Sequence, residues 1–145
     1  MDPTRPTRTI TAAAAQAAVL AACEKARSLG ARVNACVVDA GGHQIAFLRD
    51  DGAFLQSGAI ARDKAATAAG FGAPTGALYD ALKDEAAVLA GISAQPGVAL
   101  FRGGLPATVA GEVVGGIGVS GASAEVDEIC AAAGLEAAGL TQEQG

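Results

Sequence analysis

The chain has 145 residues, a mass of 14.0 kDa and a formal net charge of −5, which is the size of one ordinary domain. Apolar residues make up 51% and charged residues 17%, so the chain has enough apolar surface for a packed core and is not expected to be disordered. No run of about 20 apolar residues is free of charge or glycine, which argues against a membrane span. The net charge and the acidic pI near 4.7 argue against a general nucleic-acid binder, which normally needs a basic stripe.

Cys23, Cys36 and Cys130 each lie in alanine- or valine-rich sequence, where a cysteine usually behaves as a small buried hydrophobic residue. With a single histidine and no CxxC pair, the chain is not expected to form a zinc site. The first residues lack the charged and then apolar pattern of a secretory signal. A reduced, cytoplasmic location is therefore predicted.

We expect a single domain over residues 9–140, with a flexible head at residues 1–8 and a flexible tail at residues 141–145. Basic residues predominate in residues 1–32, whereas no lysine or arginine follows Arg102. Complementary ends of this kind are compatible with a homo-oligomer, although a solvated acidic helix explains the same pattern.

The first half of the chain is predicted to contain a helix, a β-hairpin and two further helices. The first helix begins after a Thr9 or Thr11 cap and ends near Leu29, because apolar residues recur at helical spacing up to the next glycine. Gly41-Gly42 separates two β-rich runs and is typical of a hairpin turn, since glycine accepts positive φ. The two runs and the two later helices cover residues 33–38, 43–48, 57–69 and 77–89.

The second half is predicted to contain three strands, at residues 98–101, 107–110 and 113–120, and a final helix capped by Ser123. Gly111 begins the connection between the last two strands and suits a type II′ turn. Because tight turns join consecutive strands, their pairing is antiparallel. The predicted fold class is therefore α+β, with a five-stranded antiparallel sheet flanked by helices.

A glycine-rich segment, residues 116–121, matches the GxGxxG pattern of dinucleotide-binding sites. A Rossmann unit needs a further strand after the following helix, and no strand-like sequence remains there. The alternative is a glycine-rich strand against which a helix or a second subunit packs closely. An anion site at the capped start of the final helix is also open.

Two further residues stand out. Lys64 shares a helix face with apolar residues, so it either extends to the edge of the core, pairs with an acid, or reaches an anionic ligand. His43 follows the Gly-Gly turn, and it is either a surface histidine, a haem or metal ligand, or a proton carrier. The chain has no GxSxG motif to support a serine triad.

Several segments taken in order resemble the GlcG/HbpS-like family, which includes the C-terminal domain of PduO-type proteins. They are residues 37–43, 47–53, 61–68, 103–106 and 111–121. The resemblance spans about residues 9 to 140 and implies a profilin-like fold, a five-stranded sheet between helices, usually assembled into homo-oligomers. It also implies a binding function, with haem as the ligand of several members and His43 as the haem ligand here. Asp50 departs from the family pattern, which often has methionine there.

The leading functional hypothesis is a small-ligand-binding protein whose pocket lies near the first hairpin and takes haem or a carboxylated metabolite. Cationic groups beside an apolar wall suit such an acid. The expected binding residues are His43, Arg49, Lys64, Gly103, Gly104 and Leu105.

The alternative is a cofactor-independent isomerase, tautomerase or hydrolase acting on a small organic acid. Asp39, His43 and Asp51 would transfer protons, while Lys64 or Arg49 would hold the anion. A third hypothesis is a structural or regulatory oligomer whose interface uses the glycine-rich strand. Neither nucleic acid nor a membrane is expected as a partner.

Overall fold

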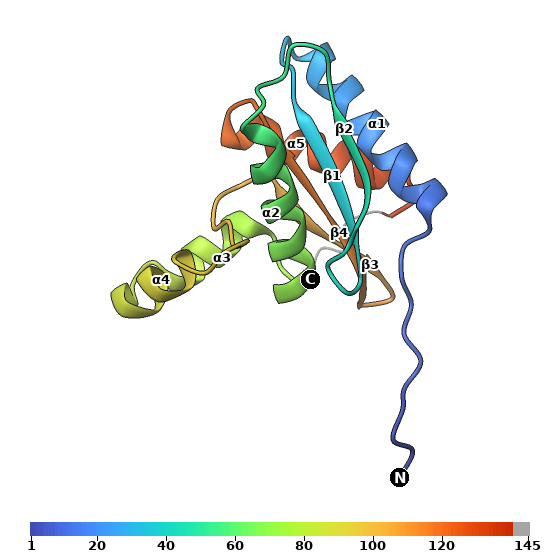
Figure 1. The fold of residues 1–145 in the computed structure, drawn as a ribbon, viewed down its shortest axis with the longest axis vertical. Helices are drawn as coiled ribbons and strands as arrows, with labels where there is room; N and C mark the ends of the chain where they lie inside the picture. The colour runs from blue at the N-terminus through green and yellow to red at the C-terminus, as the bar shows by residue number, and fades with distance from the viewer. Residues whose placement is uncertain (141–145) are drawn as a thin grey trace.

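The computed structural model describes residues 1–140, which fold into five helices and a four-stranded antiparallel sheet (Figure 1). In chain order the elements are α1 (Ala12–Ser28), β1 (Asn34–Asp39), β2 (Gln44–Arg49), α2 (Ser57–Phe71), α3 (Thr75–Leu82), α4 (Ala86–Ser93), β3 (Gly104–Val109), β4 (Glu112–Ser120) and α5 (Ala124–Ala137). The α+β class is confirmed. The predicted flexible tail, residues 141–145, lies outside the described residues.

The sheet has the strand order β2-β1-β4-β3, and every neighbouring pair is antiparallel. The predicted first hairpin is confirmed, because β1 pairs with β2 along its length. Central strands β1 and β4 are joined in register from Asn34 opposite Ser120 to Asp39 opposite Gly115. This register places the start of β1 and the end of β4 at one end of the sheet.

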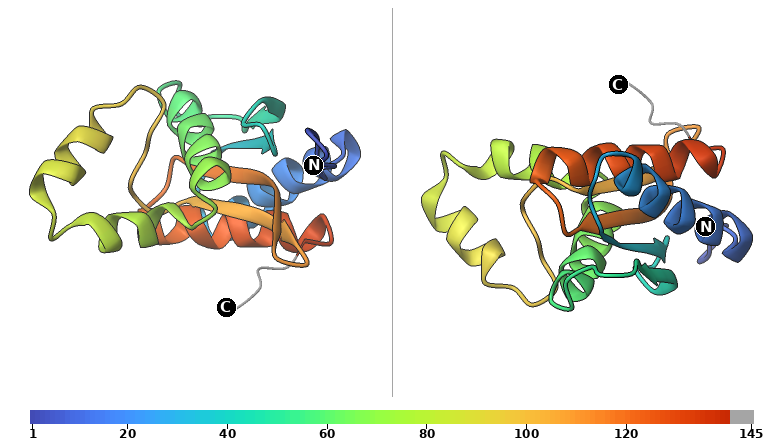
Figure 2. Two further views of the ribbon diagram at one scale, coloured as in Figure 1. Left: turned by 90° about the horizontal axis from the view of Figure 1, so that it is seen from below. Right: turned by 90° about the horizontal axis from the view of Figure 1, so that it is seen from above.

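Helices cover both faces of the sheet (Figure 2). α1 and α5 pack on one face over a core of small and branched side chains, whereas α2 packs on the other face against Cys36 and Val38 of β1. Side-chain caps stand at the N-termini of α1 and α5, as predicted. Thr11 accepts a hydrogen bond from the N–H of Ala14, and Ser123 accepts one from the N–H of Val126.

The glycine-rich segment is a packing surface for α2. A Cβ atom at Gly116 would lie 2.5 Å from the carbonyl oxygen of Ala65, and one at Gly118 would collide with the carbonyl of Ala61. Only residues without a side chain let the helix backbone approach the strand this closely. The close-packing interpretation is confirmed for a helix. The hypothesis of a subunit interface on this strand is wrong, because α2 already covers it.

The predicted strand at residues 98–101 is wrong, and the sheet accordingly has four strands rather than five. This segment runs in extended, irregular form beside α2. The N–H of Ala99 donates to the hydroxyl of Thr67, 3.0 Å away, so a side chain supplies the partner that a neighbouring strand would have supplied. Apolar sequence alone does not distinguish these two partners.

The helix predicted over residues 77–89 is interrupted. α3 ends at Leu82 with Lys83 as its C-cap, and Glu85 has φ −114° and ψ 81°, which breaks the helical path before α4. Together α3 and α4 form an arm that projects from the sheet (Figures 1 and 2). We call residues 75–93 the arm; α4 has no buried residue at all.

The two hairpin turns also differ in detail from the prediction. Ala110 and Gly111, at φ 51° and 79°, both have positive φ, which is the signature of a type I′ turn rather than a type II′ turn starting at Gly111. In the first hairpin only Gly42 has positive φ, at 87°. The strand pairing is unaffected by either difference.

Candidate functional site

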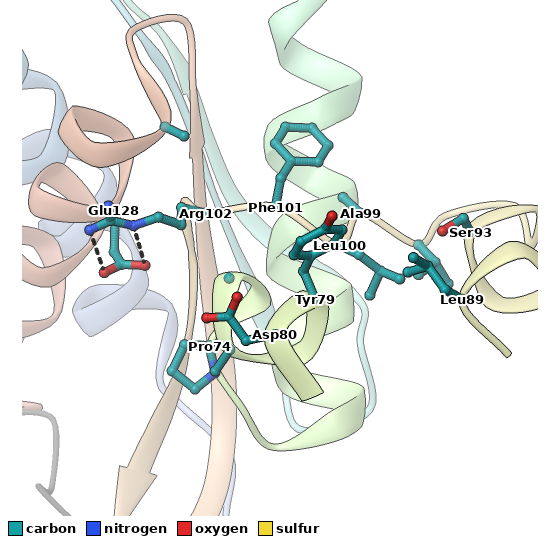
Figure 3. Close-up of a pocket in the computed structure, with 14 residues that line it drawn as sticks. Pro74, Tyr79, Asp80, Leu89, Ser93, Ala99, Leu100, Phe101, Arg102 and Glu128 are labelled. Atoms are coloured by element: carbon teal, nitrogen blue, oxygen red, sulfur yellow. Dashed lines mark hydrogen bonds and ion pairs between the residues drawn. The ribbon is translucent and has the colours of Figure 1, made fainter. Parts of the chain in front are cut away.

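A cavity of about 870 Å³ lies between the arm, residues 98–102 and the start of α5 (Figure 3). Leu89, Leu100 and Phe101 contribute apolar surface to its wall. Sequence reasoning did not find this arm cavity, because its residues come from segments that meet only in the tertiary structure. One available signal was Tyr79, the only tyrosine of the chain, which lines the cavity.

Polar groups of the arm cavity include the hydroxyl of Tyr79, the carboxylate of Asp80 and an ion pair at the start of α5. Arg102 Nη2 lies 3.2 Å from Glu128 Oε1, and Nε lies 3.4 Å from Oε2 (Figure 3). The Arg102 side chain is 47% exposed. An exposed pair of this kind is worth little, so the guanidinium is available to an acidic ligand at small cost.

Lys64 lies behind the arm cavity, buried between the two layers of helices. Its Nζ donates to Asp127 Oδ2 at 3.0 Å and to the carbonyl oxygen of Val119 at 2.9 Å. The same Nζ lies 4.7 Å from the centre of the Phe101 ring, which lines the cavity. Of the predicted alternatives for Lys64, the structure shows pairing with an acid. Its partner is Asp127, an acid in the first turn of α5.

Burial acts on both members of this pair. Loss of solvent lowers the pKa of Lys64 and raises the pKa of Asp127, and the attraction between the two charges opposes both shifts. Asp127 also accepts the N–H of Ala122 at 2.9 Å, which favours its ionised form. Lys64 belongs to α2 and Asp127 to α5, so this ion pair joins the helices on the two faces of the sheet.

Two of the predicted binding residues, Gly103 and Gly104, lie next to Lys64. A Cβ atom at Gly103 would lie 2.6 Å from Lys64 Nζ, and one at Gly104 would lie 2.5 Å from the carbonyl oxygen of Lys64. Gly103, Gly104 and Leu105 are all buried at the start of β3. Gly103 thus makes room for the Lys64 side chain and Gly104 for the Lys64 backbone, whereas Leu105 belongs to the core under α1 and α5.

His43 lies on the surface at the other end of the sheet, with its side chain 84% exposed. Its Nδ1 is 3.4 Å from Oδ1 of Asp39, and that same oxygen accepts the N–H groups of Gly41 and His43 at 2.9 and 3.0 Å. Of these hydrogen bonds, the one from the His43 N–H contributes most to lowering the pKa of Asp39. Lys64 instead bonds Val119, which pairs with Ala35 near the start of β1. One copy of the chain therefore does not place His43 and Lys64 in a shared cavity.

Arg49 and Asp51 lie far along the hairpin from His43. Arg49 ends β2 opposite Asn34, and the exposed Asp51 follows it in the next turn. The predicted proton-transfer residues are thus divided between the two ends of the hairpin, with Asp39 and His43 at one end and Asp51 at the other.

Asp50, where the family pattern often has methionine, is buried and forms ion pairs with two arginines. Its carboxylate is 1% exposed, bonds Arg27 at Nε (2.8 Å) and Nη2, and lies 3.5 Å from Arg32. The Arg27 hydrogen bond is the main reason that the pKa of Asp50 falls to about 2. The substitution fastens the end of α1 to the end of β2.

The three cysteines are buried and free, as predicted, and burial raises the pKa of each thiol to about 11. Within residues 1–140, no three histidine, cysteine or acidic side chains are grouped to hold a metal ion. None of the helices in the same residues combines the length and apolar character needed to cross a bilayer.

Comparison with known proteins gives consistent relatives. An uncharacterised 15.0 kDa protein from the dhaT-dhaS intergenic region of Citrobacter freundii is 34% identical over 137 residues, covering 94% of this chain and 96% of that protein. A double mutant of Streptomyces reticuli HbpS superposes with a TM-score of 0.85 at 39% identity, covering 94% of this chain and 91% of that one. The crystal structure of a PduOC–haem complex gives a TM-score of 0.85 at 31% identity, with coverages of 94% and 99%.

The sequence resemblance is therefore confirmed on independent grounds. A family described as haem-degrading protein HbpS-like matches residues 10–136, which is nearly the whole described chain. The four-stranded sheet, its flanking helices and the two related structures, each covering 94% of this chain, agree with that match. The chain belongs to the HbpS-like family.

Proposed function

We propose that this protein binds a small molecule of haem size in the arm cavity. The observation that carries the proposal is the cavity itself: its volume of about 870 Å³ lies within the roughly 300–1,000 Å³ typical of small-molecule and cofactor sites. Its wall is largely apolar, and a few polar groups stand at defined places, which is the usual composition of such sites.

The residues present fit haem. Leu89, Leu100 and Phe101 offer apolar surface for the macrocycle, Arg102 offers a guanidinium for a propionate, and Tyr79 offers a hydroxyl of the kind that ligates ferric haem in catalase. When bound, haem would supply a redox-active iron. A PduOC–haem complex among the related structures and the haem-degrading description of the family support the same ligand class.

The sequence-predicted iron ligand, His43, is the rival to Tyr79. With 84% of its side chain exposed, His43 gives a bound macrocycle little apolar cover within one chain, and a second copy would have to supply the rest. The arm cavity supplies that cover by itself, which is why we prefer it. A carboxylated metabolite held by Arg102 is the second predicted ligand class for this cavity.

Haemin titration followed by absorbance tests the proposal. The wild type is expected to develop a Soret band that saturates at stoichiometric haemin. Tyr79→Phe, which keeps the ring and removes the hydroxyl, should shift or weaken the band, and Arg102→Gln should weaken binding. His43→Ala should leave both the Soret band and the affinity for haemin unchanged.

The outcomes separate the two candidate sites. Loss of the band in His43→Ala with no effect of Tyr79→Phe would show that the hairpin holds the iron and that the arm-cavity proposal is wrong. Absence of a Soret band in the wild type would overturn haem as the ligand. The enzymatic alternative stays a prediction: Asp39 and His43 lie together, whereas Asp51 follows the other end of the hairpin.

The homo-oligomer and the cytoplasmic location also stay predictions. The arm supports the first of these, because α4 exposes Val88 and has no charged residue between Ala86 and Ser93. Monomeric proteins seldom leave contiguous apolar surface uncovered.

A further inference from the structure

One buried side-chain polar atom in the described residues lacks a hydrogen-bond partner. The side chain of Asn34 is fully buried, and its Nδ2 donates to the carbonyl oxygen of Phe54 at 2.9 Å. Its Oδ1 accepts no hydrogen bond from any residue between 1 and 140. Buried acceptors are nearly always satisfied, since leaving one unpaired is costly. The oxygen therefore calls for a donor from outside residues 1–140, and a bound molecule can supply one.

Asn34 lines a pocket of about 440 Å³ between β2 and the first turns of α2, which we call the β2–α2 pocket. Its lining residues include Asn34, Gln44, Phe47, Arg49, Gly58 and Arg62. A Cβ atom at Gly58 would lie 3.8 Å from Asn34 Oδ1 and 3.2 Å from Phe47 Cζ. The glycine therefore keeps the space in front of the unpaired oxygen clear.

Two cations stand at the same pocket. Arg49 comes from the end of β2 and Arg62 from the second turn of α2, and neither has a carboxylate within ion-pair distance among residues 1–140. The arginines Arg27, Arg32 and Arg102, by contrast, are all paired. Guanidinium groups are the preferred partners of carboxylates, so two unpaired ones beside one pocket attract an acid.

We infer that the β2–α2 pocket binds a small hydroxy acid. Its carboxylate pairs with Arg49 and Arg62, and its hydroxyl donates to Asn34 Oδ1. Phe47 provides an apolar side for the carbon chain. This site shares no lining residue with the arm cavity, so the inference does not depend on haem binding.

Isothermal titration with a matched pair of acids tests the inference. Malate and succinate have the same two carboxylates and differ by one hydroxyl. Malate is expected to bind, and succinate to bind about tenfold or more weakly, because only malate satisfies the buried acceptor. Equal binding of the two acids would show that Asn34 Oδ1 takes no part, and no binding of malate would overturn the site.

Three variants locate the binding. Arg49→Gln and Arg62→Gln each remove one exposed cation without disturbing the fold, and each should weaken malate binding about tenfold or more. Gly58→Ala has no backbone strain to overcome, and its methyl group should displace Phe47 and weaken binding as well. Arg5→Gln, the same change at an exposed arginine outside the pocket, is the control.

The result is read together with the haemin titration. Arg49→Gln and Arg62→Gln should leave haemin binding unchanged, whereas Tyr79→Phe should leave malate binding unchanged. Equal loss of malate binding in Arg5→Gln would mean that the acid responds only to overall charge, which would overturn the inference. The same variants therefore distinguish failure of this site from failure of the arm cavity.

Discussion

The sheet with α1, α2 and α5 differs from the arm in how its side chains are used. In the sheet region, alanines, glycines and branched residues are packed to contact, and even a lysine is enclosed. In the arm, α3 buries only Thr75 and α4 buries nothing. Side chains in the first region are committed to folding, whereas those of the arm remain free to meet a ligand or a partner. Equivalent substitutions in the two regions should therefore have very different consequences.

Ion pairs should give the largest contrast. Lys64→Met leaves Asp127 buried without its cation, so the free energy of unfolding should fall by about 3–5 kcal/mol. Arg102→Gln breaks an exposed pair beside the arm cavity and should cost less than about 1 kcal/mol. Urea unfolding of both variants measures the difference.

A double variant checks the cause. Lys64→Met with Asp127→Leu removes both charges and should recover much of the stability lost in Lys64→Met alone. If Lys64→Met is as stable as the wild type, the ion pair does not hold α2 and α5 together. The largest expected difference between the sheet region and the arm would then be absent.

Glycine substitutions should give the next largest contrast. Gly118→Ala places a methyl group against the backbone of Ala61 and should destabilise the protein by about 3 kcal/mol. Gly91→Ala, in α4, meets nothing within 4 Å and should stabilise the helix by up to about 1 kcal/mol. Thermal unfolding followed by circular dichroism measures whether each substitution lowers or raises the stability. Destabilisation by Gly91→Ala would mean that another chain covers α4.

The same contrast explains how much could be predicted from the sequence. The outer helices, α2 and the first hairpin follow from caps, glycine turns and apolar spacing, which are local signals. Residues 98–101 look like a strand, yet their backbone is satisfied by Thr67 on α2, which no local pattern shows. Apolar residues continue on both sides of residues 83–85, so apolar spacing predicts one helix where the structure has two.

The candidate sites depended even more on tertiary contacts. Lys64 was recognised as an unusual charge on an apolar face, but its partner Asp127 is 63 positions away. The hypothesis of one pocket containing both His43 and Lys64 requires the two side chains to lie near the same end of β1. His43 lies beside Asp39 at the end of β1, whereas Lys64 bonds Val119, which pairs with Ala35 near its start. Arg49 was identified from its charge, whereas the unpaired oxygen of Asn34 beside it appears only once the backbone is placed.

Asp50 should make the stability of the sheet region depend on acid. Its pKa is about 2 in the folded protein, below the ordinary 3.8, so the Arg27 pair stabilises the fold above pH 4. Protonation removes this contribution as the pH falls from about 4 to 2, which amounts to about 2 kcal/mol. Unfolding in urea across this range should show the loss in the wild type and a smaller loss in Asp50→Asn. Parallel curves for the two proteins would show that Asp50 is not strongly paired.

The smallest effect should come from the arm itself, and a matched valine pair measures it. Val37→Ala removes two methyl groups from a fully buried position and should cost about 2 kcal/mol. Val88→Ala makes the same change on α4, where the residue is 40% exposed, and should cost less than about 0.5 kcal/mol. If Val88→Ala instead costs as much as Val37→Ala, and the loss shrinks on dilution, then a second copy covers α4 and the arm belongs to a subunit interface.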